Sequence, residues 1–274
     1  MVKNPAAFAH PWKRSGPVSG LVFDWPFIAK MVACKSKTPM NAKEILDELK
    51  PLGRESYKKT IFNHGVREPC YGVSVADLKK FEKRFKKNYQ LALDLYGTGV
   101  YDAMYLAGLI ADDAKMTKDD LRRWAEGAYC RPLAGATVAW VAAGGKHGWE
   151  LALEWIDSKK ELVAATGWAT LGSLVSIKPD AELDLPTLKK LVLRVEKTIH
   201  QAPDQARNQM NGFVIAVGCY VTPLSDFAIQ TGQKIGPATA DLGNNACQIP
   251  FIPDYIRKVQ TRGSIGKKRK SAKC

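Results

Sequence analysis

The feature that most constrains this chain is a long succession of amphipathic helical segments with almost no strand pattern between them. Leu78, Phe81 and Phe85 share one helical face, and the preceding Ser74-Val-Ala-Asp77 has the form of a capping box at a helix start. Thr117-Lys-Asp-Asp120 predicts a second such start. Val214-Ile-Ala-Val217 has strand propensity but lies inside a longer helical window. The regular structure is therefore expected to be helical.

The predicted helices follow one another in pairs. The pairs are 101–113 with 117–128, 133–143 with 147–157, 160–176 with 186–200, and 203–221 with 224–234. Their period is near the roughly 40 residues of HEAT and armadillo repeats. One pair cannot bury its own apolar face, whereas stacked pairs form a curved solenoid with a concave side. We therefore predict an all-α, HEAT/armadillo-like helical repeat solenoid, an α-α superhelix, whose concave side is the ligand surface.

Three regions are expected along the chain. Residues 1–39 carry several prolines and few periodic apolar positions, so they predict an irregular N-terminal arm. Residues 40–260 form the HEAT-like repeat domain, and residues 261–274 form a basic C-terminal tail. Because the tail has almost no apolar anchor, we expect part of it to be disordered.

The net charge of +14 is concentrated in a few segments. Residues 257–274 hold eight Lys or Arg and no acid, and residues 50–87 hold eleven bases against four acids. Residues 88–256 hold fifteen bases against nineteen acids, so the body is not cationic throughout. Contact with a nucleic acid must then come from a local face or from the tails. A dense run on the polar side of the predicted amphipathic helix after Ser74 comprises Lys79, Lys80, Lys83, Arg84, Lys86 and Lys87.

Motifs for other classes of chemistry are absent from the sequence. The six cysteines are scattered without a CxxC pair, and the four histidines show no HxxxH spacing, so no metal site is predicted. Gly144-Gly145 lacks the pattern of a nucleotide-binding loop, so no cofactor is expected. No run of apolar residues is long enough to span a membrane. We expect a cytoplasmic monomer with no membrane partner and no small-molecule cofactor.

Several segments resemble the AlkD-like DNA alkylation repair family, and their order and spacing carry the resemblance over residues 40–274. They are Tyr71-Gly-Val73, Asp102-Ala-Met-Tyr-Leu-Ala-Gly-Leu-Ile-Ala111, Val163-Ala-Ala-Thr-Gly-Trp168, Met210-Asn-Gly-Phe-Val-Ile-Ala-Val217 and the closing Arg262–Lys270 stretch. The resemblance implies a superhelix of HEAT-like repeats that holds duplex DNA on its concave face. Characterised members excise cationic alkylated purines such as N3-methyladenine and N7-methylguanine without flipping the base.

The resemblance fails at the positions that carry catalysis. Catalytic members have a tryptophan followed one helical turn later by an aspartate, and here Trp124 is matched but the aspartate position falls on Ala128. The family's arginine falls at Glu161, and a later family tryptophan falls at Phe213. The usual catalytic aspartate and arginine are therefore not retained, and we assign no catalytic residue.

Two hypotheses of different class follow. The first is a DNA-binding protein of the alkylation repair family, either an N-glycosylase acting on alkylated purines in duplex DNA or a diverged non-catalytic member. The alternative is a helical-repeat scaffold that binds a protein, which the nearly neutral body favours. Under the first hypothesis the predicted DNA contacts are Trp124, Arg131, Lys160, Arg207, Asn208, Asn211, Phe213, Lys267, Lys268, Arg269 and Lys270.

Overall fold

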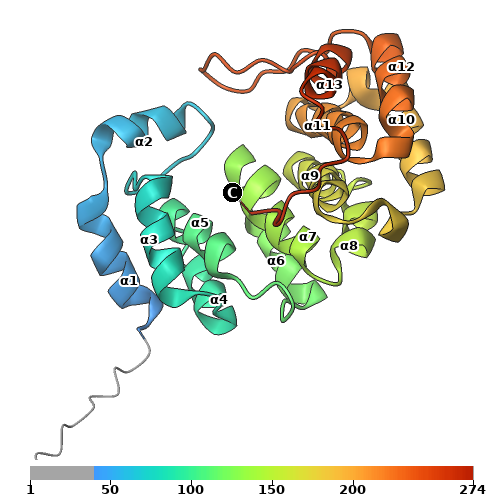
Figure 1. Ribbon diagram of the computed structural model, residues 1–274. Helices are drawn as coiled ribbons and strands as arrows, with labels where there is room; N and C mark the ends of the chain where they lie inside the picture. The colour runs from blue at the N-terminus through green and yellow to red at the C-terminus, as the bar shows by residue number, and fades with distance from the viewer. Residues whose placement is uncertain (1–39, 274) are drawn as a thin grey trace, which may run out of the picture. The chain divides into compact units, whose positions relative to one another are not determined.

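The computed structural model describes residues 40–273, and the N-terminal arm predicted for residues 1–39 lies outside them. Every regular element of the described part is helical, which confirms the all-α prediction. The main helices are α1 Ala42–Leu49, α2 Glu55–Phe62, α3 Val75–Phe85, α4 Tyr89–Gly97, α5 Tyr101–Ile110, α6 Lys118–Gly127, α7 Ala139–Gly144, α8 Gly148–Trp155, α9 Glu161–Ile177, α10 Leu185–Thr198, α11 Asp204–Tyr220, α12 Ser225–Ile235 and α13 Ile252–Thr261 (Figure 1). Shorter elements are the π-helix η2 Leu133–Val138, which continues into α7, and the 3-10 turns η1 Lys50–Leu52, η3 Asp180–Glu182, η4 Ile199–Gln201 and η5 Thr222–Leu224.

The helix starts follow the local sequence signals. Before α6, the Thr117 hydroxyl accepts from the Asp120 amide at 3.1 Å, and the Asp120 carboxylate accepts from the Thr117 amide at 3.0 Å. This reciprocal pair is a complete capping box. Before α3 only half of the predicted box forms, because the Asp77 carboxylate accepts from Lys80, Arg54 and the Ser74 hydroxyl instead of the Ser74 amide.

A row of successive helices forms one side of the domain and holds much of its core. α3 contacts α5, α5 contacts η2, η2 and α7 contact α9, α9 contacts α11, and α11 contacts α13. Every residue of α5 is buried, and most of α9 is buried as well. A helix that is apolar all round needs partners on all sides. We call this row, α3, α5, η2–α7, α9, α11 and α13, the inner row; α4, α8, α10 and α12 pack against it.

Two predicted pairings are wrong. The segment 101–113 was expected to pair with 117–128, but α5 contacts α4, α3 and η2 most extensively, whereas α6 packs on η2 and α9. The segment 160–176 was expected to pair with 186–200, but α9 contacts α8 and α11 most extensively, whereas α10 packs on α11 and α12. The linker of residues 178–184, which contains η3, separates the two helices. Periodicity identifies the apolar face of each helix, but it does not say which neighbour covers that face.

Asp102, within the family-like segment of α5, has a structural role. Its buried carboxylate accepts from the Tyr71 amide at 2.6 Å and from the Val73 amide at 2.7 Å. Gly72 lies between them with a φ of 79°, a conformation that L side chains rarely adopt, and a Cβ there would lie 2.7 Å from the Arg54 carbonyl oxygen. The carboxylate thus fastens the loop before α3 to the inner row.

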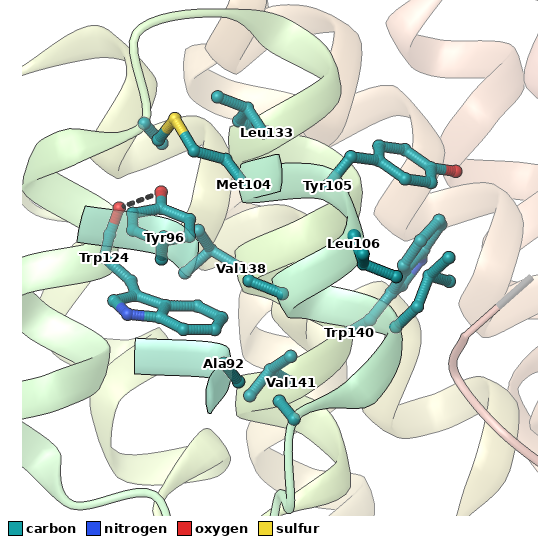
Figure 2. Packing of buried hydrophobic residues seen from close by; sticks show 14 of the residues in the cluster. Ala92, Tyr96, Met104, Tyr105, Leu106, Trp124, Leu133, Val138, Trp140 and Val141 are labelled. Atoms are coloured by element: carbon teal, nitrogen blue, oxygen red, sulfur yellow. Dashed lines mark hydrogen bonds between the residues drawn. The ribbon is translucent and has the colours of Figure 1, made fainter. Parts of the chain in front are cut away.

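Trp124 lies in the core instead of on a DNA-facing surface, which corrects the prediction made for it. Its indole stacks on the Tyr96 ring with centroids 4.2 Å apart and an interplanar angle of 8° (Figure 2). The Tyr96 hydroxyl donates to the Trp124 carbonyl oxygen at 2.7 Å, and only 3% of Trp124 is exposed. A side chain enclosed in this way supports the packing of α6 on α4.

Substituting this indole should affect folding before it affects binding. We expect Trp124→Ala to lower the free energy of unfolding by about 3–5 kcal/mol, because it removes a buried aromatic ring and leaves a cavity. Urea denaturation followed by circular dichroism measures the change, and Phe62→Ala, at a half-exposed aromatic of α2, is the control. An unfolding midpoint equal to that of the wild type would contradict this assignment.

Candidate nucleic-acid interface

The C-terminal segment after α13 is ordered and runs across the ends of three inner helices (Figure 1). We call residues 262–273 the tail. Its Gly266 amide donates to the Cys219 carbonyl oxygen near the end of α11 at 2.9 Å. Its Arg269 amide donates to the Ser176 carbonyl oxygen near the end of α9 at 2.8 Å. The last carbonyls of a helix have no partner within the helix, so the tail supplies donors that these ends lack.

Two lysines anchor the tail. Lys268 Nζ lies 2.8 Å from Asp180 Oδ1 and 2.9 Å from the Val175 carbonyl oxygen at the end of α9. Lys273 Nζ lies 2.7 Å from Asp113 Oδ1 and 2.9 Å from the Ala111 carbonyl oxygen after α5. A cation at a helix C-terminus also opposes the partial negative charge of the helix dipole there.

These contacts correct two predictions. The tail is not disordered over residues 262–273, because its anchors are carbonyl and carboxylate groups, together with the buried Ala272, instead of a set of large apolar side chains. Lys268 was expected to bind DNA, but its side chain is only 18% exposed and is paired with Asp180. The neighbouring Lys267, Arg269 and Lys270 remain exposed.

The tail and the end of α3 border one cleft of about 730 Å³, which we call the basic cleft. Its floor includes Leu109 and Trp140 of the inner row. Five lysines line it against two carboxylates, and one of these carboxylates, Asp113, is already paired with Lys273. The charged lining residues are Lys83, Lys86 and Lys87 at the end of α3, Lys270 and Lys273 of the tail, and the acids Glu82 and Asp113.

The basic run of α3 divides into paired and cleft-lining cations. Lys80 lies 2.7 Å from the Asp77 carboxylate. Arg84 lies 2.5 Å from the Glu48 carboxylate and also packs over the Phe85 ring. Lys83, Lys86 and Lys87 instead line the basic cleft. The structure thereby separates the cations of this run that have carboxylate partners from the lysines that line the cleft.

A smaller pocket of about 430 Å³ is lined by α11, α13 and the first part of the tail, and we call it the tyrosine pocket. Tyr220 and Tyr255 line it together with three cations, and no carboxylate is among its lining residues. Neither tyrosine lies in a motif, so neither was among the predicted contacts. The one sequence signal that could have pointed to this pocket was the basic Arg262–Lys270 stretch, which lies beside the two tyrosines. The cations are Arg262, Lys267 and Arg269.

Two predicted contacts on α11 are held inside the fold, and this corrects their expected role. The Arg207 guanidinium donates to the carbonyl oxygens of Thr239 and Ala202, each at 2.6 Å, and lies 3.1 Å from the Asp204 carboxylate. The Asn211 side chain is buried and donates to the Pro250 carbonyl oxygen at 3.0 Å. Both residues hold the segment between α12 and α13 instead of facing DNA.

The remaining predicted residues are not brought together. Phe213 is almost fully buried against Trp168, with ring centroids 5.3 Å apart, although it borders a shallow hollow with Arg269. Lys160 is exposed before α9 and pairs with Glu126. Asn208 is partly exposed on α11. Arg131 lies 2.6 Å from His64 Nδ1.

Burial and neighbouring charge set the protonation of several groups near these surfaces. Burial raises the pKa of Asp113 above its ordinary value, and the charge of Lys273 acts in the opposite direction. Burial likewise raises the pKa of Tyr220, while the Arg269 guanidinium opposes the shift, so the phenol is neutral at physiological pH. Burial, followed by the charge of Arg131, lowers the pKa of His64, which favours the neutral ring as an acceptor.

Within the described residues, no three His, Cys, Asp or Glu side chains are grouped so that they could hold a metal ion. Three of the cysteines in that range, Cys70, Cys130 and Cys219, are buried thiols, and Cys247 is an exposed one. No single helix there has both the length and the apolar character to cross a membrane. The segments Asp204–Tyr220 and Thr222–Ile235 meet that criterion only together, across a bend of 116°.

Lys86 allows a test of backbone strain at the basic cleft. It ends α3 with a φ of 51° and a ψ of −146°, a conformation that glycine adopts far more readily. We expect Lys86→Gly to raise the free energy of unfolding by about 1 kcal/mol, measured by urea denaturation. Lys87→Gly removes the same charge from a residue outside the positive-φ region and should give no such gain. Equal effects of the two substitutions would show that charge, and not strain, is responsible.

The chain is similar to several known proteins. Uncharacterized proteins of Listeria innocua and Listeria monocytogenes are each 29% identical to this chain over 221 residues, covering 78% of this chain and 95% of the relative. One solved structure matches with a TM-score of 0.80 and 33% identity, covering 86% of this chain and all of the other. It is described as coming from a new family of proteins related to the HEAT-like repeat DNA glycosylases, with affinity for branched DNA structures.

The likeness confirms that the fold is the HEAT-like helical repeat predicted from the sequence. The profile described as DNA alkylation repair enzyme matches residues 45–205, from α1 to the start of α11. Since this match spans more than half of the chain, the protein belongs to the DNA alkylation repair enzyme family.

Proposed function

We propose that this protein binds branched DNA through the basic cleft and the tail, and that it does not excise bases. The observation that carries the proposal is the convergence of lysines from two remote segments on one cleft. Lys83, Lys86 and Lys87 come from the end of α3, and Lys270 comes from the tail, where Lys273 is already paired with Asp113. Phosphate neutralisation by such cations supplies much of the affinity of proteins for nucleic acids.

The order of the tail favours binding. Lys268 and Lys273 fix the tail backbone, so the exposed Lys267, Arg269 and Lys270 are held in place before a ligand arrives. A preorganised surface loses less conformational entropy on association than a flexible basic tail does. The tail thus acts as part of the folded interface.

The preference for a branch rests on two supports. The solved structure that matches this chain at 33% identity belongs to proteins with affinity for branched DNA structures. In addition, cations of the tail line two separate hollows, the basic cleft and the tyrosine pocket. A branched molecule presents phosphates along more than one direction. Two separate cationic surfaces therefore fit a branched ligand better than they fit a continuous duplex.

Base excision lacks its usual residues here. Ala128, at the position of the family's catalytic aspartate, is a buried alanine. Glu161, at the position of the family's arginine, accepts the Gln205 amide at 2.7 Å and so holds the start of α11. The nearby acid Glu126 pairs with Lys160. Without a carboxylate aimed at a developing sugar cation, removal of N3-methyladenine or N7-methylguanine is the less supported function.

The scaffold alternative receives little support from the surface. Among the described residues only four large hydrophobic side chains are exposed, and they are spread over different elements. A surface that docks a protein usually offers a contiguous apolar patch. The four are Leu52 of η1, Phe62 of α2, Leu193 of α10 and Tyr255 of α13.

Fluorescence anisotropy with a labelled three-way junction and a duplex of equal length tests DNA binding. We expect tighter binding of the junction, with affinity falling roughly a hundredfold between 50 and 200 mM salt if about four phosphates are neutralised. The double variant Lys87→Ala, Lys270→Ala should bind several-fold more weakly with a shallower salt dependence. The control is Lys190→Ala, Lys197→Ala on α10, away from the cleft. Binding without salt dependence, or an equal loss in the control, would argue against the proposal.

Excision is tested separately with DNA that contains N7-methylguanine. We expect the full-length protein to release no base above the spontaneous rate, because Ala128 supplies no carboxylate. Chromatography of the released purine measures this, with a known alkylpurine glycosylase as the positive control. Release in proportion to protein concentration would refute the non-catalytic assignment.

A further inference from the structure

We propose that the tyrosine pocket receives a single unstacked nucleotide from the branch point of the bound DNA. The inference rests on the proposed function, because it assigns a substrate feature to the same interface. It concerns a pocket formed by α11, α13 and the tail, beyond the basic cleft.

The pocket has an aromatic and apolar lining with a cationic border. Tyr220 of α11 and Tyr255 of α13 line it together with the apolar side chains of Ile215 and Val259. Gly212 and Ala216 also line it, so small residues leave room for a flat ring. Tyr255 is 46% exposed, more than any other large hydrophobic residue of the described range. An exposed aromatic face beside a pocket is suited to stacking on a nucleobase.

The charges around the pocket have one sign. Arg262, Lys267 and Arg269 line it, and none of the three forms a salt bridge with a carboxylate within the described residues. Burial raises the pKa of Tyr220 and the Arg269 guanidinium opposes that shift, which places this cation within electrostatic reach of the phenol. The pocket therefore offers a neutral aromatic surface next to unpaired positive charge, the complement of a base attached to its phosphate.

Continuity with the basic cleft favours a nucleotide that belongs to a strand. Lys267 and Arg269 border the tyrosine pocket, and Lys270, the next residue, borders the basic cleft. A strand whose nucleotide enters the pocket can therefore place its neighbouring phosphates along the tail. The volume of about 430 Å³ lies within the range of small-ligand pockets and far below that of a duplex.

The pocket also explains how a branch could be preferred over a continuous duplex. A base in a duplex must be unpaired and unstacked before it can enter, which costs a few kcal/mol. At a branch point stacking is already interrupted, so this cost is smallest for an unpaired nucleotide there. The preference for a branch over a continuous duplex then comes from the deformability of the DNA together with stacking of the base in the pocket.

The test uses the full-length protein and two three-way junctions that differ at one position. One junction carries an unpaired adenine nucleotide at the branch point, and the other carries an abasic nucleotide there, so both have the same backbone charge. We expect the wild type to bind the adenine junction roughly tenfold more tightly by anisotropy. Tyr255→Ala should remove that difference while leaving the abasic junction bound as before. Tyr255→Phe should restore it, because the ring and not the hydroxyl does the stacking.

Controls separate stacking from general effects. Phe62→Ala removes another half-exposed aromatic, on α2, and should retain the tenfold preference. Circular dichroism should show both alanine variants folded, as expected for exposed positions. Competition by adenosine monophosphate should exceed competition by inorganic phosphate at equal ionic strength, because only the nucleotide offers a ring.

The outcomes distinguish the two proposals. Equal wild-type binding of the adenine and abasic junctions, with salt-sensitive junction binding intact, overturns the nucleotide pocket and leaves the proposed function standing. A preference that survives Tyr255→Ala, or equal competition by phosphate and nucleotide, also overturns the pocket assignment. Absence of binding to any branched DNA overturns the proposed function and this inference together.

Discussion

Pairing of the free carbonyl ends of the inner helices with the C-terminal tail is the interaction on which the proposed interface depends. Helices that end without intrahelical partners for their last carbonyls need donors from elsewhere. Gly266, Lys268, Arg269 and Lys273 supply such donors to groups near the ends of α11, α9 and α5. Because Lys268 and Lys273 are each also paired with a carboxylate, the segment is held at its middle and near its C-terminal end. A sequence that is basic enough to be disordered is thereby part of the folded domain.

The anchoring divides the charge of the tail into two roles. Lys268 and Lys273 stabilise the fold, whereas Lys267 and Arg269 border the tyrosine pocket and Lys270 borders the basic cleft. The same division occurs in α3, where Lys80 and Arg84 have carboxylate partners and the last lysines line the basic cleft. Net charge alone would count all of these side chains equally. The paired cations contribute little to a surface potential, so the phosphate-binding capacity lies in the remainder.

The chain has the architecture of its family, while side chains at several positions that resemble the family serve packing. Trp124 stacks on Tyr96, Asp102 fastens the loop before α3, and Glu161 receives the amide of Gln205. Each of these contacts satisfies a group that would otherwise be buried without a partner or leave a void. The resemblance to the family therefore predicts the fold of this protein better than it predicts the chemistry.

Local sequence determined the helices, since Thr117 with Asp120 and the recurring apolar positions of α5, α9 and α11 act within a turn or two of chain. It also shows an alanine, Ala128, at the position where the resemblance to the family implies an aspartate. Only the tertiary structure decided which helices are neighbours, that Arg207 and Asn211 face inward, and that Tyr220 and Tyr255 meet beside the tail. Those contacts join residues far apart in the chain. Whether a lysine is an anchor or a ligand-binding group depends on the carbonyls and carboxylates that folding brings to it.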